Sequence, residues 1–424
     1  MTRTRILGVV FALAACGDAP GTRSTDGSSG STAEAGSTTA SSDGGASSES
    51  SGGGTTSPRA TGSSGSSGAD SSETSTGAGP LEVTPWEWAL PPGFPQPVVP
   101  QSNPMTVEGV ELGRHLFFDT RLSVDGTYAC SSCHDPESAF TDGLAMAEGV
   151  TGQIHTRGSM SLANVAYAGT LAWANPELLD LETHALVPMF GTEPVEMGLI
   201  DEDDLVSRIA SEPVYDELFA AAYPTDADPI TLAHVTQALA SFQRSLISGR
   251  APFDRWFFEG DEEAISEAAK RGWDLFNVPG ECTYCHFGFN FSNASYFEGM
   301  PQRPLEFHNT ALYNEDGQGG YPAGNEGLYA FSGEDADMGK FKSPTLRNIA
   351  VTAPYMHDGS IATLEEMLEH YSVGGRVESP NADHRMRTFT LKDDEVADLI
   401  AFFESLTDDA FLTNPAHADP WVGR

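Results

Sequence analysis

The stretch Cys130-Ser131-Ser132-Cys133-His134 has the pattern Cys-x-x-Cys-His. The same pattern occurs a second time as Cys282-Thr283-Tyr284-Cys285-His286. Cys-x-x-Cys-His is the spacing of covalent c-type haem attachment, because two such cysteines reach the two vinyl groups of one porphyrin and the histidine binds the iron. A zinc site would need both sets of ligands in one place, and a redox dithiol has no use for the histidine. We therefore predict two haem c groups, held by Cys130, Cys133, His134, Cys282, Cys285 and His286.

The only other cysteine, Cys16, ends a hydrophobic N-terminal segment. An apolar run from Ile6 to Leu13 leads into Leu13-Ala14-Ala15-Cys16, which resembles a bacterial lipoprotein signal with its lipobox. The run is too short for a transmembrane helix. We expect residues 1–16 to be a signal peptide and Cys16 to carry a lipid anchor. Because Gly17 follows the cysteine, we expect the protein on the outer membrane, facing the periplasm or the cell surface.

Composition divides the remaining chain into a tether and a folded part. Residues 17–84 consist largely of Ser, Gly, Thr and Ala, so we expect a disordered tether there. The rest is long enough for two domains, which we place at 85–260, around the first haem, and 261–424, around the second. The formal net charge of -39 excludes nucleic acid as a partner but permits a neutral or basic protein.

Each haem motif belongs to a longer repeat. Gly113-x-x-Leu116-Phe117 precedes the first motif and matches Gly272-x-x-Leu275-Phe276 before the second. After the motifs, Phe140-Thr141-Asp142 matches Phe291-Ser292-Asn293. We predict a mainly α fold of two cytochrome c-like haem domains related by duplication. His115 has no counterpart in the second copy, so we expect a surface residue there and not an iron ligand.

The spacing of apolar residues predicts the secondary structure. We expect a proline-rich extended arm at 86–103 and no strands, because no run alternates in polarity. A capping-box pattern, Thr363 with Glu366, opens one of the later helices. The expected helices span 110–118, 201–211, 231–248 and 269–276, and two more begin at Thr363 and Thr390.

Several further motifs resemble the bacterial di-haem cytochrome c peroxidases and the MauG enzymes. They are Arg157–Tyr167, Trp173, Leu181–Ala185 and Pro194–Met197 in the first half, and Thr345–Asn348 and Thr352–Ser360 in the second. The stretch Trp173-Ala-Asn-Pro-Glu-Leu178, with Leu186-Val-Pro-Met-Phe-Gly191 after it, is most similar to the methanobactin-associated di-haem enzymes called MbnH. The resemblance covers residues 108–406.

The resemblance implies that peroxide binds at the first haem, opposite His134. Glu196 matches the family's distal acid, which moves a proton between the two peroxide oxygens; it could instead be a solvated loop acid. His184 stands where the family usually has glutamine, so its role departs from the pattern. His155 lies near the position of a displaceable distal ligand in some peroxidases, or is an ordinary loop histidine.

The resemblance also implies the axial pair of the second haem. Tyr371 matches the tyrosine of MauG, where peroxidases that store one electron on this haem carry methionine. A phenolate is hard and anionic, so a His286 and Tyr371 pair favours oxidised iron. Met367 is the competing ligand one turn earlier on the same helix. Met356 and His370 are weaker candidates, and Tyr371 could also be an ordinary buried tyrosine.

Two more assignments come with the family. Trp173 matches a tryptophan between the haems that relays electrons, although a lone tryptophan is more often a core residue. Asn164, Thr352 and Pro354 match a calcium site, where amide and backbone oxygens suit a hard cation. Otherwise these three are turn and loop residues.

The family implies a haem-dependent oxidoreductase. The MbnH-like function is that hydrogen peroxide reacts at the first haem, the second shares the oxidising equivalents, and a tryptophan on a copper-binding partner protein is oxidised. The alternative is a peroxidase that reduces peroxide to water with electrons from a small cytochrome or copper protein. A pure electron-transfer cytochrome would not need Glu196.

Overall fold

The computed structural model describes residues 82–278 and 281–422. The predicted signal peptide, Cys16 and almost all of the predicted tether lie outside these residues. Within them the secondary structure is helical, with isolated β-bridges and no strand, so the expected mainly α fold is confirmed. None of the helices described is long and apolar enough to cross a membrane.

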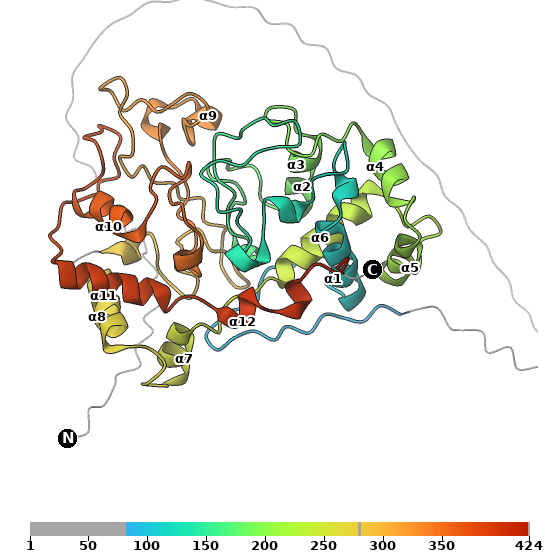
Figure 1. Ribbon diagram of the computed structural model, residues 1–424, viewed down its shortest axis with the longest axis horizontal. Helices are drawn as coiled ribbons and strands as arrows, with labels where there is room; N and C mark the ends of the chain where they lie inside the picture. Colours follow the sequence, from blue (N-terminus) through green and yellow to red (C-terminus); the bar gives the residue numbers. More distant parts are fainter. Residues whose placement is uncertain (1–81, 279–280, 423–424) are drawn as a thin grey trace, which may run out of the picture. The chain divides into compact units, whose positions relative to one another are not determined.

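Twelve α-helices occur in the described ranges (Figure 1). They are α1 Val107–Phe117, α2 Leu181–His184, α3 Leu186–Phe190, α4 Glu202–Ile209, α5 Val214–Ala222, α6 Leu232–Ser245, α7 Pro252–Glu259, α8 Glu267–Asn277, α9 Tyr329–Ser332, α10 Leu364–Ser372, α11 Asp393–Glu404 and α12 Asp409–Leu412. The 3-10 helices are η1 Thr120–Leu122, η2 Cys130–Ser132, η3 Pro136–Ser138, η4 Val165–Tyr167, η5 Cys282–Tyr284, η6 Asp335–Asp337, η7 Ile349–Val351 and η8 Pro415–His417.

The predicted helices are present, with shifted ends. The last long helix begins at Asp393 and not at Thr390, because the carboxylate of Glu395 accepts the backbone N–H of Lys392 and fixes the first turn there. At α10, Thr363 caps the helix as predicted, accepting from Glu366 N at 3.2 Å. The Glu366 carboxylate reaches back to Ala362 N at 2.9 Å, one residue before the donor of a regular capping box.

The duplication is visible in two helix pairs, α1 with α6 and α8 with α11 (Figure 1). A Cβ on Gly113 would lie 1.9 Å from the carbonyl oxygen of Ala238 in α6. A Cβ on Gly272 would lie 2.0 Å from the carbonyl oxygen of Asp398 in α11. Only glycine permits this close approach of two backbones. The repeated Gly-x-x-Leu-Phe pattern therefore marks the crossing point of each pair.

A pair of asparagines repeats the same symmetry beyond these helices. Asn164 and Asn348 both have φ 61°, and each directly precedes a 3-10 helix, η4 or η7. Asn164 Oδ1 accepts from Ser248 N, and Asn348 Oδ1 accepts from Asp408 N, both at 2.8 Å. Asn348 Nδ2 also donates to Ser248 Oγ at 3.0 Å, which ties one copy to the other.

Two hydrophobic cores form around the two repeats, and each core includes side chains from the other half of the sequence. The first core gathers side chains of α1, α5 and α6, and the second gathers those of α8, α10 and α11. Phe411 and Trp421, near the end of the chain, pack in the first core. Phe253 and Ala174, from before the second repeat, pack in the second. Each core is therefore completed by residues from the other half of the sequence.

The expectation that His115 is a surface residue is wrong. Its side chain is 2% exposed, and its ring lies edge-on to Trp421 with centroids 5.3 Å apart. Trp421 Nε1 donates to the His115 carbonyl oxygen at 3.0 Å. The C-terminal segment covers this side of α1, which the pattern of the helix alone does not reveal.

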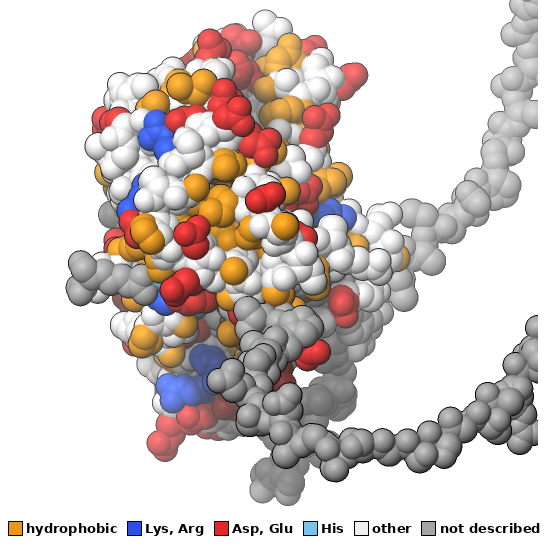
Figure 2. All heavy atoms as spheres, turned by 90° about the vertical axis from the view of Figure 1, so that its right-hand side faces the viewer, with side chains coloured by type: hydrophobic (Ala, Val, Ile, Leu, Met, Phe, Trp, Pro, Cys, Tyr) orange, Lys and Arg blue, Asp and Glu red, His pale blue; other side chains and the backbone are white. Residues whose placement is uncertain are grey.

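The surface reflects the acidic composition. Figure 2 shows one face of the molecule, on which acidic side chains are scattered among neutral ones and basic side chains are few. This agrees with 61 Asp and Glu against 22 Lys and Arg in the full sequence. A partner that docks by charge would carry a basic surface.

Candidate functional site

Both Cys-x-x-Cys-His motifs open into one cavity of about 850 Å³. Its wall includes all four motif cysteines, His134 and His286. Each motif begins as a 3-10 turn, η2 or η5, in which the histidine N–H donates to the carbonyl oxygen of the first cysteine. The volume is near the upper end of the usual range for ligand pockets, roughly 300 to 1,000 Å³.

The two motif histidines are held in the same way. Nδ1 of His134 lies 2.8 Å from the carbonyl oxygen of Phe140, and Nδ1 of His286 lies 3.0 Å from that of Phe291. A carbonyl only accepts hydrogen bonds, so each Nδ1 carries the proton and each Nε2 remains available as a metal ligand. Phe140 and Phe291 have φ values of 63° and 49°, and this left-handed backbone explains why a similar loop follows both motifs.

The thiols fit covalent haem attachment better than a zinc site or a redox dithiol. Burial raises the pKa of Cys130 and Cys282 to about 12, and that of Cys133 and Cys285 to about 11. Reactive dithiols and zinc ligands require the thiolate, which a lowered pKa favours. No cluster of three or more His, Cys, Asp or Glu in the described part of the chain is placed to hold a metal ion. Thioether bonds to two haem groups would use all four sulfurs as neutral groups.

The structure brings Glu196 and His155 together at the first motif. Both line the cavity, and Glu196 Oε1 lies 3.9 Å from His155 Nε2. Burial raises the pKa of Glu196; burial and the charge of Arg157 lower that of His155. Both shifts favour neutral groups, between which one proton can move. The family resemblance assigned both residues to the distal side of the first haem, but their contact was not predictable, because they belong to separate loops.

His184, the last residue of α2, also lines the cavity. Burial, then the positive charge that His134 would carry, lowers the pKa of His184 to about 4. Its imidazole is therefore neutral at physiological pH and can donate one hydrogen bond. Asp180 caps the helix that carries it, since Asp180 Oδ1 accepts from Thr183 N at 2.8 Å.

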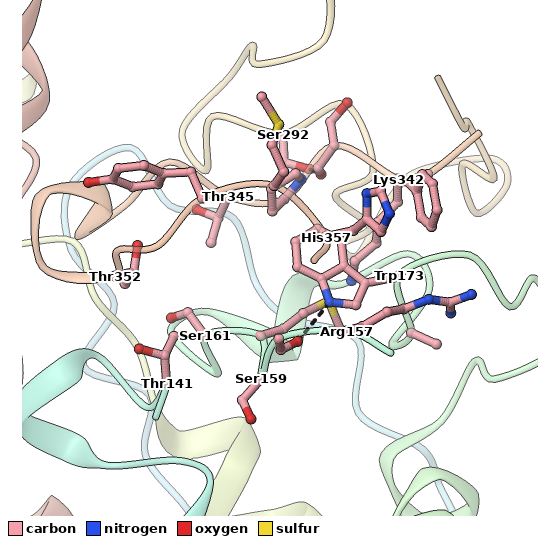
Figure 3. Close-up of a pocket in the computed structure, with 18 of the residues that line it drawn as sticks. Thr141, Arg157, Ser159, Ser161, Trp173, Ser292, Lys342, Thr345, Thr352 and His357 are labelled. Atoms are coloured by element: carbon pink, nitrogen blue, oxygen red, sulfur yellow. Dashed lines mark hydrogen bonds between the residues drawn. The ribbon is translucent and has the colours of Figure 1, made fainter. Parts of the chain in front are cut away.

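Trp173 comes from the first half of the chain and packs against the second core. Its Nε1 donates to the Gly158 carbonyl oxygen at 2.9 Å, and its own carbonyl oxygen accepts from Lys342 N at 2.9 Å. Figure 3 shows the indole in the cavity wall with Arg157, Lys342 and His357 around it. Sequence reasoning missed Lys342, whose pKa burial lowers to about 8.

The candidate ligands of the second haem differ in whether they line the cavity. Tyr371, Met367 and Met356 line the cavity, whereas His370 does not. His370, a residue of α10, is 2% exposed and buried outside the cavity wall. Burial, then the nearby thiols of Cys285 and Cys282, raises the pKa of Tyr371, so its phenol keeps its proton unless a cation is bound. Tyr371 as a ligand stays a prediction.

The three predicted calcium ligands, Asn164, Thr352 and Pro354, all line the same cavity. Asn164 already uses its side chain within the protein, since Oδ1 accepts from Ser248 N and Nδ2 donates to the Ser248 carbonyl oxygen at 2.7 Å. Thr352 Oγ1 donates to Ile349 O at 3.2 Å. Each oxygen keeps a lone pair for a cation, so the calcium site stays a prediction.

Comparison with known proteins identifies the class. The family model for di-haem cytochrome c peroxidase matches residues 107–263. The methylamine utilization protein MauG of Methylorubrum extorquens is 38% identical over 320 residues, covering 74% of this chain and 83% of that protein. Cytochrome c551 peroxidase of Nitrosomonas europaea is 32% identical, with coverages of 72% and 82%.

A solved structure gives a finer comparison. The crystal structure of a MauG-like protein associated with microbial copper homeostasis is 42% identical and superposes with a TM-score of 0.77. It covers 79% of this chain and 99% of its own. The chain therefore belongs to the di-haem cytochrome c peroxidase and MauG family, and is a haem-dependent oxidoreductase. The family implies two haem c groups, peroxide as substrate, and a protein partner or electron donor.

Proposed function

We propose that this enzyme uses hydrogen peroxide to oxidise a tryptophan side chain on a copper-binding partner protein. The observation that carries the proposal is Tyr371, whose phenol faces the same cavity as His286. A phenolate ligand favours oxidised iron and so suits an enzyme that distributes oxidising equivalents over two haem groups. The likeness to a MauG-like protein named for copper homeostasis supports the choice of partner.

The first motif would hold the haem at which peroxide binds and which would take up its oxidising equivalents. Glu196 takes the proton from the near peroxide oxygen and returns it to the far oxygen, so that water leaves. His155, at 3.9 Å, is close enough to exchange that proton through a water molecule. His184, neutral at physiological pH, donates a hydrogen bond that orients the peroxide.

Other parts of the proposal concern the chain as a whole. Trp173 relays electrons between the two halves, since its indole is oxidisable, lines the shared cavity and packs against the second core. A calcium ion at Asn164, Thr352 and Pro354 would fix the relative placement of the two motifs. A lipid on Cys16 would anchor the protein to the outer membrane, and the serine- and glycine-rich tether would hold it away from the bilayer.

The proposal predicts a covalent product on the partner. The purified two-haem protein is incubated with peroxide and the small exported copper-binding protein encoded nearest to it, and mass spectrometry measures tryptophan oxidation. We expect a kynurenine-type product with the parent and at least tenfold less with Tyr371→Phe. Tyr355→Phe is the matched control, since Tyr355 lines the same cavity and its hydroxyl donates to Ile349 O.

The second candidate is simple peroxide removal, which the peroxidase names of several relatives favour. It predicts rapid peroxide consumption with a reduced small cytochrome or copper protein, and no change in any partner side chain. That result, together with unchanged spectra of the second haem in Tyr371→Phe, would contradict protein oxidation.

A further inference from the structure

A tyrosine outside the cavity wall is paired with a carboxylate. Tyr313 is partly exposed, and its hydroxyl donates to Asp358 Oδ2 at 2.7 Å. Asp358 is 9% exposed, and its Oδ1 accepts from Ser360 N at 3.1 Å. Burial raises the pKa of Asp358, but His357, Tyr313 and Ser360 together hold it below its ordinary value. An ionised carboxylate at this distance is a ready proton acceptor.

Tyr313 is connected inward by aromatic contacts. Its ring meets that of Tyr321 edge to face, with centroids 5.4 Å apart. Tyr321 is 7% exposed and lies 6.2 Å from Phe341 and 6.3 Å from His357, measured between centroids. Phe341 and His357 are stacked at 3.7 Å and both line the cavity. The contacts thus lead from the cavity wall to a partly exposed phenol.

The same chain of contacts reaches Trp173. The indole N–H donates to the Gly158 carbonyl oxygen at 2.9 Å, and Gly158 N donates to the His357 carbonyl oxygen at 3.0 Å. Figure 3 shows Trp173 and His357 in the same part of the wall. Asp358, the proton acceptor, directly follows His357 in the chain. Trp173 and the Tyr313–Asp358 pair therefore belong to one hydrogen-bonded and stacked unit.

We propose that Tyr313 is a relay residue that carries oxidising equivalents from the cavity to the protein surface, with Asp358 as its proton acceptor. In this step Tyr313 gives one electron inward through Tyr321, its O–H bond breaks, and a new O–H bond forms at Asp358 Oδ2. Hydrogen peroxide is the terminal oxidant: two such electrons and two protons from solvent convert it into two water molecules, and the oxidised partner releases two protons to solvent. The tyrosyl oxygen then regains an electron from the partner side chain and the proton from Asp358. The proposal rests on the peroxide chemistry of the proposed function.

Other tyrosines lack one of the required features. Tyr321 donates to the amide oxygen of Asn309 at 2.9 Å, and an amide cannot take up the proton. Tyr215 donates to Asp119 Oδ2 at 2.6 Å, but it is 0% exposed in the first core and is not part of the cavity wall. Tyr313 combines a carboxylate partner, an aromatic path inward and contact with solvent.

The groups around Tyr313 and Asp358 determine the pKa of the Tyr313 phenol. Arg376 faces Tyr313, and its guanidinium donates to the Ser360 carbonyl oxygen at 3.1 Å. Burial, then the hydrogen bond and charge of Asp358, raises the pKa of Tyr313 above its ordinary value. The phenol therefore keeps its proton in the resting enzyme and loses it only together with an electron.

The first test is electron paramagnetic resonance on samples frozen within milliseconds of adding peroxide to the two-haem protein. We expect a tyrosyl radical whose hyperfine pattern changes with ring-deuterated tyrosine. The signal should fall at least tenfold in Tyr313→Phe, while the first phase of peroxide consumption stays at the parental rate. Tyr329→Phe is the control, because Tyr329 is also partly exposed and has no carboxylate hydrogen bond in the described structure. A full signal in Tyr313→Phe, or none in the parent, would overturn the relay.

The second test needs no peroxide. Tyrosine labelled with carbon-13 at Cζ reports each phenol by nuclear magnetic resonance, and Tyr313→Phe identifies the signal. We expect the pKa of Tyr313 to fall in Asp358→Asn and to return in Asp358→Glu, with the radical signal lost and regained in parallel. An unchanged pKa in Asp358→Asn would contradict the pairing. A parental radical without any product on the partner would sustain the relay and contradict the proposed protein substrate.

Discussion

The Glu196 carboxyl and the His155 imidazole form an acid-base pair in a shared wall of the cavity. They lie 3.9 Å apart, and burial moves the pKa of each in the direction of its neutral form, upward for Glu196 and downward for His155. Proton transfer within peroxide requires a group that changes charge easily near the working pH. Glu196 meets that requirement because burial weakens the preference of a carboxyl for its ionised form.

Glu196→Gln keeps the side-chain size and removes the proton acceptor. We expect oxygen–oxygen cleavage to slow by roughly a hundredfold or more, the range that general acid-base groups contribute, with the haem content unchanged. Stopped-flow absorbance after mixing with peroxide measures the rate. Glu148→Gln is the control, since Glu148 lines the cavity but is exposed. A parental rate in Glu196→Gln would transfer the role to His184.

The same reaction should depend on pH in a defined direction. A carboxyl acts as a base only when ionised, and the pKa of Glu196 is raised above 4.5. The rate therefore falls as the pH drops through this raised pKa, so the acid limb lies above that of an ordinary glutamate. Rates measured across the pH range should lose this limb in Glu196→Gln and keep it in Glu148→Gln. A limb that survives in Glu196→Gln belongs to another group.

The roles of these residues were only partly predictable from the sequence. The haem-attachment residues follow from spacing alone, and all six line the cavity. Glu196, Trp173 and Tyr371 were found through family motifs, and they too face it. The His155–Glu196 distance, the burial of Lys342 and the pairing of Tyr313 with Asp358 depend on loops far apart in sequence. Local patterns carry no information on such contacts.

At the scale of helices, the glycine in each Gly-x-x-Leu-Phe repeat fixes how two helices cross. The apolar pattern correctly predicted the existence of α1, α6, α8 and α11, because it reflects which face of each helix is buried. Helix ends were less predictable, since single hydrogen bonds such as Glu395 to Lys392 N decide them. The repeated Gly-x-x-Leu-Phe pattern was visible in the sequence, but the close contact of its glycine with a second helix was seen only in the structure.

Gly113→Ala should therefore destabilise the protein. The added Cβ would lie 1.9 Å from a backbone oxygen of α6, so the helices must separate, at a cost of about 1 to 3 kcal/mol. Gly109→Ala, in the same helix, is the control, because its Cβ would meet the Thr106 hydroxyl at 2.8 Å and no other atom closer than 3.9 Å. Denaturant unfolding followed by haem absorbance measures both. Equal stability of the two variants would contradict the crossing.

For the molecule as a whole, a small polar cluster joins the two halves. Asp408 is 1% exposed, and its Oδ2 accepts from Gly249 N at 2.9 Å and Arg250 N at 2.8 Å. Its Oδ1 caps α12, accepting from Phe411 N at 3.0 Å. One carboxylate thus holds the segment that leaves α6 and the segment that leaves α11. This function was not predictable from the residue pattern, because Asp408 is one acid among many.

Asp408→Ala should cost about 3 kcal/mol or more of unfolding free energy, since it leaves buried N–H groups without acceptors. Asp409→Ala removes an exposed neighbouring acid and should change stability by less than about 0.5 kcal/mol. Both values come from the same denaturant titration. A loss in Asp408→Ala no greater than in Asp409→Ala would show that the two halves are held together elsewhere.

Because the C-terminal segment completes the first core, the structure has a consequence for the order of folding and haem attachment. The first core lacks Phe411 and Trp421 until the last residues have been synthesised, although its own haem motif is made much earlier. Until then the loop with Cys130 and Cys133 is not enclosed by a finished core. The thiols that later lie buried, with raised pKa values, therefore stay accessible to an attachment enzyme until the C-terminal segment has folded onto this core.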